Sequence, residues 1–224
     1  GEEETTKKEE QTTKKEETTT QHPIKNPGVQ QEAADSEVAA NISLNKYIAG
    51  IDTTFSSTEG KKNSNEGIEK LFDNNINTKF FTDDVPVISI AWRMSRAAIV
   101  KNYTLVTAND AAEYSFRNPH KWRLLGSMDG KDWIQLDFVE NGGIEHKNLE
   151  SYTYTTDVQK ACQYFMLRIE DSGDDGKLYF GSQLSEIYLN GDVVRITSDI
   201  GVDLDEHIEG INTSATTVKG YNDK

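Results

Sequence analysis

Short strand-like runs fill residues 41–189 of the sequence, and they constrain its fold more than any other feature. They are rich in Val, Ile, Tyr and Phe and are separated by Gly, Asn, Asp or Pro, as in VPVISIAWRM, AAIVKNYTLVTA, KWRLLGSM, DWIQLDFV, ESYTYTTD, CQYFMLRIE and LSEIYLNG. SYTYTT alternates with a period of two, which is typical of a strand with one exposed face. Helical character is limited to a short turn in GIEKLFDNNINTKFFT, which a polar loop follows. The pattern predicts an all-β antiparallel sandwich or barrel.

The two ends of the chain have a different composition. Residues 1–38 contain TTKKEE twice and almost no large apolar side chain, so they cannot bury enough surface to offset the entropy of ordering. We expect a disordered linker there, because the Thr pairs weigh against a helix of Glu–Lys pairs. The folded domain is expected over residues 39–192. Residues 193–224 form either a linker or the edge of a next domain, and the segment after Gly191 can begin with one more strand.

Charge and composition exclude several classes of partner. The formal net charge of −14 would repel a nucleic-acid backbone. No run of apolar residues is long enough for membrane insertion. The single Cys162 forms no internal disulfide, and its position beside the apolar run YFMLRI predicts a buried, inert thiol.

Catalytic motifs are absent from the sequence. It contains no G-x-S-x-G elbow, no H-E-x-x-H and no phosphate-cradling Gly loop, and His22, His146 and His207 are scattered. No carboxylate pair stands out for glycoside hydrolysis. We therefore expect a chain that is not an enzyme, although it can be part of a multidomain one.

The stretch MDGKDW joins two strand-like runs. It fails the pattern of an EF-hand loop, because Gly130 follows Asp129 directly. Asp-Gly between two apolar runs is instead a strong hairpin signal, since Gly accepts positive φ. Asp129 and Asp132 are therefore predicted to lie in a turn, not in a metal loop or an acid pair.

Two polar segments remain as candidate sites. The first, EKLFDNNINTKFF, concentrates side-chain oxygens at Asp73, Asn75, Asn77 and Thr78. Calcium takes six to eight oxygen ligands of this kind, but an ordinary polar loop is an equal alternative on the pattern alone.

The second segment, TANDAAEYSFRNPHKW, mixes planar polar groups with aromatic rings. Sugars are bound by this combination, because polar groups contact hydroxyls while a ring packs on the apolar face. The alternative is a solvated loop with internal turns. The polar candidates are Asn109, Asp110, Glu113, Arg117 and His120, and the aromatic ones are Tyr114 and Phe116.

Four segments, taken in order along the chain, resemble the discoidin domain, also called the coagulation-factor type C domain. They are KLFDNNINTKFFT, NYTLVTANDAAEYSFRNPHKWRLLGSMDGKDWIQLD, YFMLRI and QLSEIYL. Many bacterial members of that group are family 32 carbohydrate-binding modules. The resemblance covers residues 40–191. It implies a jelly-roll-like β-sandwich of about eight strands with galactose-binding-like topology.

The resemblance also implies a structural Ca²⁺. Its ligands would be the backbone carbonyl of Lys70 and the side chains of Asp73, Asn75, Thr78 and Glu186, with Glu186 supplied by QLSEI. The chain departs from the family pattern at two positions. Asn74 replaces Gly, which is tolerable because Asn adopts the left-handed conformation, and Phe80 replaces Trp, which keeps an aromatic in the core.

Ligand binding in the family occurs on loops at one end of the sandwich. By position, these are the loop that contains Arg117 and the loop DDGKLYFGSQ, and either Phe180 or Tyr179 corresponds to a stacking aromatic. The predicted ligand-binding residues are Asn109, Asp110, Arg117, His120, Tyr179 and Phe180. Asp110 and Arg117 can alternatively pair with each other across the loop.

Our first hypothesis is therefore a non-catalytic, calcium-stabilised carbohydrate-binding module. The resemblance implies a secreted or cell-surface, multidomain bacterial protein and a monomeric module that binds glycans with galactose or N-acetylhexosamine. The alternatives are an adhesion module for proteins or cell surfaces, and an accessory domain that packs on a catalytic neighbour without a ligand of its own.

Overall fold

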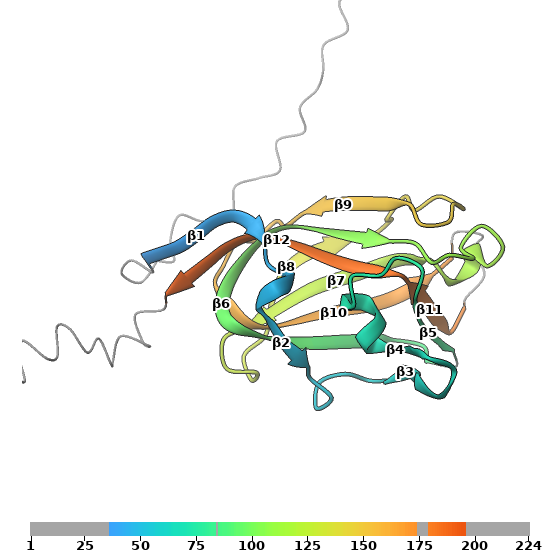
Figure 1. Ribbon diagram of the computed structural model, residues 1–224, viewed down its shortest axis with the longest axis horizontal. Helices are drawn as coiled ribbons and strands as arrows, with labels where there is room; N and C mark the ends of the chain where they lie inside the picture. Colours follow the sequence, from blue (N-terminus) through green and yellow to red (C-terminus); the bar gives the residue numbers. More distant parts are fainter. Residues whose placement is uncertain (1–35, 84, 174–178, 196–224) are drawn as a thin grey trace, which may run out of the picture. The chain divides into compact units, whose positions relative to one another are not determined.

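The computed structural model describes residues 36–83, 85–173 and 179–195. Within these residues the regular elements are β-strands and short 3-10 helices (Figure 1). The strands are β1 (Ser36–Ser43), β2 (Ile48–Ile51), β3 (Gly60–Lys61), β4 (Glu66–Gly67), β5 (Phe80–Asp83), β6 (Ile88–Val106), β7 (Pro119–Ser127), β8 (Ile134–Val139), β9 (Ser151–Thr155), β10 (Cys162–Ser172), β11 (Gly181–Leu184) and β12 (Glu186–Arg195). The helices are η1 (Asn45–Tyr47), η2 (Lys62–Ser64), η3 (Ile68–Phe72) and η4 (Ser115–Arg117). No described helix is both long enough and apolar enough to cross a membrane.

The strand β6 links the two layers of the fold. The sequence pattern divides its residues into two strands, whereas the structure has one strand of 19 residues. Its first half pairs with β10 and its second half with β12, and Figure 1 shows β6 curving between them. The residues that suggest a break, Ser95 and Arg96, are exposed, and no Gly or Pro stands between the halves. The backbone ladder therefore bends without ending.

The two layers share this strand and enclose one apolar core. One layer has the order β2-β6-β10-β7-β8 and the other β9-β6-β12-β1, with all pairings antiparallel. The core between them includes Trp92, which stacks on Phe165 with ring centroids 6.1 Å apart. The pair β5–β11 lies beside this arrangement (Figure 1). The predicted all-β antiparallel sandwich is confirmed.

A polar network crosses the core near β7. The Tyr103 hydroxyl donates to Asp137 Oδ2 at 2.6 Å and accepts from Trp122 Nε1 at 2.8 Å. Burial raises the pKa of Asp137, and the hydrogen bond from Tyr103 opposes this shift. Because β6, β7 and β8 each supply one member, the network fixes the register of three strands.

The β7–β8 connection is the predicted hairpin turn. Gly130 has φ of +72°, and the Asp129 carboxylate accepts from the backbone N–H of Lys131 at 2.8 Å and of Asp132 at 3.0 Å. Those two N–H donors, with Asp132 contributing most, lower the pKa of Asp129. Asp129 therefore stabilises the turn through its own backbone. Cys162 is buried as expected, and burial raises its pKa to about 12.

The strands β1 and β12 bring both ends of the domain together. Ser36 pairs with Arg195, so the sheet extends beyond the predicted boundaries of 39 and 192, and the strand expected after Gly191 is the continuation of β12. The rest of the predicted N-terminal linker and C-terminal extension, residues 1–35 and 196–224, lies outside the described residues. The opposite end of β12, at Glu186, adjoins Val106 and hence the start of the β6–β7 loop.

Candidate functional site

Aromatic side chains from two loops meet at this end of the sandwich. The β6–β7 loop supplies Phe116, whose ring lies edge-on to Tyr179 with centroids 4.9 Å apart. The Ser182 hydroxyl donates to the Arg117 carbonyl at 3.0 Å and joins the two segments. Phe116 is 37% exposed and Phe180 is 45% exposed, which is high for large apolar side chains. The structure therefore brings the β6–β7 loop beside Tyr179. Residues 174–178, the first half of the second loop predicted to bind ligand, lie outside the described residues.

Arg117 is enclosed by aromatic rings at this junction. Its guanidinium carbon lies 4.0 Å from the ring centroid of Tyr114, 4.3 Å from that of Phe81 and 5.4 Å from that of Phe116. Its Nε is buried and has no hydrogen-bond partner. No carboxylate among the described residues forms an ion pair with it. We define Tyr114, Phe116, Arg117, Tyr179 and Phe180 as the aromatic cluster.

Asn109 and Asp110 hold the same loop from another direction. The Asn109 side chain donates to the Asn77 carbonyl at 3.2 Å, and Asp110 Oδ2 accepts from Lys79 Nζ. Lys79 also donates to Gln183 Oε1 at 3.2 Å. Asp110 thus pairs with Lys79, and not with Arg117 as one alternative proposed. Asn109 and Asp110 therefore bond to residues that support the loop, and not to the rings around Arg117.

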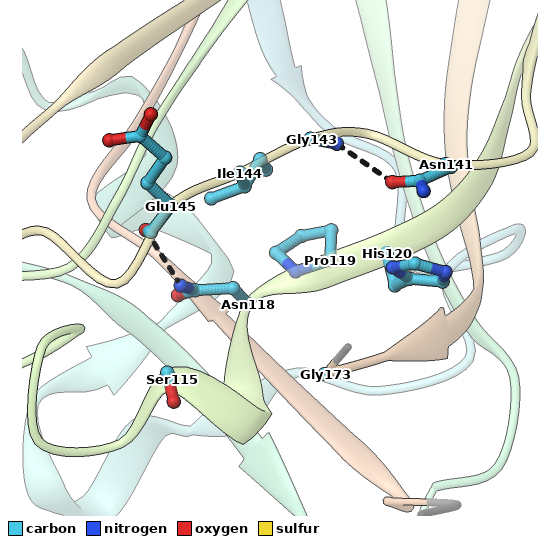
Figure 2. Close-up of a pocket in the computed structure, with 9 residues that line it drawn as sticks. All are labelled: Ser115, Asn118, Pro119, His120, Asn141, Gly143, Ile144, Glu145 and Gly173. Carbon is cyan, nitrogen blue, oxygen red and sulfur yellow. Dashed lines mark hydrogen bonds between the residues drawn. The ribbon is translucent and has the colours of Figure 1, made fainter. Parts of the chain in front are cut away.

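His120 lies at a cavity of about 400 Å³ next to the aromatic cluster. Figure 2 shows the end of the β6–β7 loop and the start of β7 on one side and the β8–β9 loop on the other. The lining residues are Ser115, Asn118, Pro119, His120, Asn141, Gly143, Ile144, Glu145 and Gly173. Ser115 lines the cavity while the adjacent Phe116 contacts Tyr179, so cavity and cluster share one segment. The sequence reasoning missed the β8–β9 loop, although its ENGGIE stretch carries a turn signal.

Two carboxylates meet at the loop of residues 73–78, which we call the cation loop. Asn75 N–H donates to Asp73 Oδ1 at 3.0 Å and to Glu186 Oε1 at 2.7 Å. The Thr78 hydroxyl donates to Asp73 Oδ2 at 2.8 Å. Glu186 is fully buried, and its Oε2 has no hydrogen-bond partner. Burial, together with the neighbouring Asp73, raises the pKa of Glu186 to about 7.

The donor set at the cation loop fits a hard cation such as Ca²⁺. A buried carboxylate with an unpaired oxygen beside a second carboxylate is unfavourable without a positive partner. Lys70 Nζ, 3.8 Å from Asp73 Oδ2, supplies only a distant positive charge. Within the described ranges no three His, Cys, Asp or Glu side chains gather as metal ligands, so a cation would rely on two carboxylates and neutral oxygens. Calcium accepts such mixed oxygen sets.

The two departures from the family pattern have the expected structural outcome. Asn74 has φ of +57°, the left-handed conformation in which Asn substitutes for Gly. Phe80 is fully buried. The Asn75 side-chain oxygen accepts from Asn77 N–H at 3.1 Å, so in this structure it stabilises the turn.

Comparison with known proteins supplies a structural likeness. No family model matches the sequence, and no curated protein matches it either. Among solved structures, the Clostridium perfringens module CpGH89CBM32-5, in complex with GalNAc-β-1,3-galactose, has a TM-score of 0.53 at 15% identity, covering 66% of this chain and 99% of that one.

Two further structures are similar to a comparable degree. A family 32 carbohydrate-binding module of a family 31 glycoside hydrolase from Clostridium perfringens has a TM-score of 0.51 at 14% identity, covering 66% of this chain and 93% of that one. The C-terminal domain of a chitobiase from Bacteroides fragilis has a TM-score of 0.51 at 20% identity, covering 69% of this chain and 100% of that one. At these identities the likeness concerns the fold. The chain has the discoidin-like, galactose-binding-like β-sandwich fold of family 32 carbohydrate-binding modules.

Proposed function

We propose that this chain is a non-catalytic carbohydrate-binding module of a larger secreted or cell-surface protein. The observation that carries the proposal is the aromatic cluster, where the exposed ring of Phe116 lies beside the Arg117 guanidinium and a second exposed ring, Phe180, follows Tyr179 in the chain. Among the described residues the guanidinium has no ion-pair partner. Rings of this kind pack on the apolar faces of sugars, while an adjacent planar cation donates hydrogen bonds to sugar oxygens. The neighbouring cavity at His120 offers space for a second residue of a glycan.

The similar structures support this class of ligand. One of them, CpGH89CBM32-5, was solved with GalNAc-β-1,3-galactose. Glycans that contain galactose or N-acetylhexosamine are therefore the first ligands to test. The residues proposed to contact them are Arg117, His120, Tyr179 and Phe180, whereas Asn109 and Asp110 would position the loop.

A structural Ca²⁺ is the second part of the proposal. Asp73 and Glu186 would hold it, with Asn75, Thr78 and the Lys70 carbonyl as neutral ligands, and it would neutralise the carboxylates that meet in the cation loop. Because Asn109 donates to the Asn77 carbonyl, an ordered cation loop also supports the base of the β6–β7 loop.

The position of the first and last described residues, Ser36 and Arg195, suits a tethered module. Ser36 and Arg195 lie side by side at one end of the β1–β12 pair, and the aromatic cluster lies at the other. A strand of ten residues spans roughly 30 Å, so linkers would leave the ligand end free. We expect a monomer with weak single-site affinity, which linkage to other domains would raise through avidity.

Binding to anionic lipid or to a protein surface is the second candidate for the same fold. The net charge of −14 opposes adsorption to anionic membranes. Sedimentation with phosphatidylserine vesicles tests this alternative, and binding there without glycan binding would favour it.

Glycan-array binding tests the proposal. We expect the chain to bind one class of glycan. Phe180→Ala should reduce that binding about tenfold or more, because the substitution removes the exposed ring on which the sugar would pack. Met128→Ala is the matched control, because Met128 is also an exposed apolar residue but lies in the hairpin turn at the far end of β7. Absence of binding to every glycan, or equal loss in the two variants, would contradict the proposal.

A further inference from the structure

We propose that Arg117 binds the carboxylate of an acidic sugar, so that the module selects glycans with uronic or sialic acid residues over their neutral counterparts. This inference rests on the proposed function, because it assumes that the aromatic cluster is the glycan site. It adds a requirement for charge that exposed rings alone would not impose.

The guanidinium of Arg117 is held in place before any ligand arrives. The rings of Tyr114 and Phe81 lie at 4.0 and 4.3 Å from its carbon, and the ring of Phe116 lies at 5.4 Å. Such contacts restrict a long side chain that otherwise loses much rotamer entropy on binding. A fixed, planar guanidinium matches the geometry of a carboxylate, which accepts two parallel N–H bonds.

Among the described residues, no acidic side chain neutralises the positive charge of Arg117. Asp110 pairs with Lys79, and Asp83 pairs with Lys61. The neighbouring Glu113 side chain raises the pKa of Tyr114. Of the described carboxylates, none is in ion-pair distance of Arg117. An anionic ligand would therefore supply a negative partner that the described side chains do not.

Partial burial of Arg117 strengthens the preference for a charged partner. Its Nε is enclosed without an acceptor, while the residue as a whole remains partly exposed, which leaves the terminal N–H groups as the part that a ligand reaches. Hydrogen bonds between ionised groups are about twice as strong as neutral ones, and removal from water increases the difference. A neutral hydroxyl would satisfy the geometry but not the charge. Two described basic side chains nearby, Lys79 and Lys61, are already paired with carboxylates.

Calorimetric titration with matched ligands tests the inference. We expect oligogalacturonate to bind about tenfold more tightly than its carboxyl-reduced form, or sialyllactose more tightly than lactose, and the preference to shrink as salt rises. Arg117→Gln should abolish the preference, and Arg117→Lys should keep part of it because it retains charge without the planar fork. Arg168→Gln, at an exposed Arg on the middle of β10, is the control and should leave the preference unchanged.

The outcomes separate this inference from the proposed function. Equal binding of acidic and neutral ligands, or a preference that survives in folded Arg117→Gln, overturns the inference and leaves glycan binding intact. Failure of both ligands, together with an array that shows no glycan binding, overturns both. A preference for sulfated sugars over carboxylated ones also overturns it, since it would indicate an anion site not specific for carboxylates.

Discussion

Removal of calcium is expected to lower the melting temperature by several degrees, because the folded chain would then bury Glu186 beside Asp73 without a cation. A ligand at about a thousand times its Kd stabilises the folded state by about 4 kcal/mol, and chelation removes that contribution. Differential scanning calorimetry in millimolar Ca²⁺ and in excess EGTA measures the shift. The expectation rests on the contacts of these two carboxylates. Asp73 and Glu186 both accept from the N–H of Asn75, and Glu186 Oε2 has no hydrogen-bond partner.

Variants of the cation loop distinguish this site from calcium bound elsewhere. Asp73→Asn should abolish most of the calcium-dependent shift, because it removes a charged ligand but keeps the hydrogen-bond acceptor of the turn. Glu69→Gln, an exposed carboxylate in the adjacent η3, is the control and should retain the shift. A melting temperature that is the same in Ca²⁺ and EGTA, or the same shift in Asp73→Asn, would show that the cation loop holds no structural calcium.

Tyr103→Phe is expected to lower the free energy of unfolding by about 3 kcal/mol. The substitution leaves Asp137 Oδ2 without its 2.6 Å donor and Trp122 Nε1 without its 2.8 Å acceptor, and Asp137 is only 4% exposed. The cost of an unpaired buried charge exceeds the net value of an ordinary hydrogen bond. Urea unfolding of the two proteins measures the difference.

The penalty for Tyr103→Phe should grow with pH. Burial raises the pKa of Asp137, and the Tyr103 hydroxyl opposes this shift, so its removal raises the folded-state pKa further above 3.8. A carboxyl with a raised folded-state pKa stabilises the fold at low pH, and this contribution is lost as pH rises through that pKa. The variant should therefore be closer to the wild type at pH 5 than at pH 8.

Tyr154→Phe is the control for that experiment. Its hydroxyl donates to the Gly142 carbonyl at 2.8 Å, so the variant also loses one tyrosine hydrogen bond but leaves no carboxylate unpaired. We expect a loss of about 1 kcal/mol that does not change between pH 5 and 8. Equal losses in the two variants would mean that the Tyr103 network contributes no more than an ordinary hydrogen bond.

The sequence pattern predicted the fold class because four strands carry apolar or alternating runs of their own. β7, β8, β9 and β10 each coincide with a predicted run, and the hairpin at Gly130 follows from Asp-Gly. β3 and β4 have two residues each, too few for a period, and β1 begins in a segment that resembles a linker. β6 was divided because exposed Ser95 and Arg96 interrupt its apolar pattern.

Only part of the candidate site was accessible from sequence. Asn75 and Glu186 share a hydrogen bond although 111 positions separate them, and the likeness to discoidin domains, not any local pattern, paired them. Two contacts of the site depend on where β5 lies beside the β6–β7 loop. They are the contact of the Phe81 ring with Arg117 and the pairing of Asp110 with Lys79. Side chains that meet only through the tertiary fold leave no periodic signal.

Mapping of the ligand site by NMR tests the central claim most directly. Amide resonances of the ¹⁵N-labelled chain would be followed while the saccharide that binds best on the array is added. We predict shifts centred on residues 115–120 and 179–182 and extending to residues 141–145, which line the neighbouring cavity, with the resonances around Met128 unchanged. Shifts centred on the hairpin end, or none at saturating saccharide, would contradict the account of the aromatic cluster as a glycan-binding site.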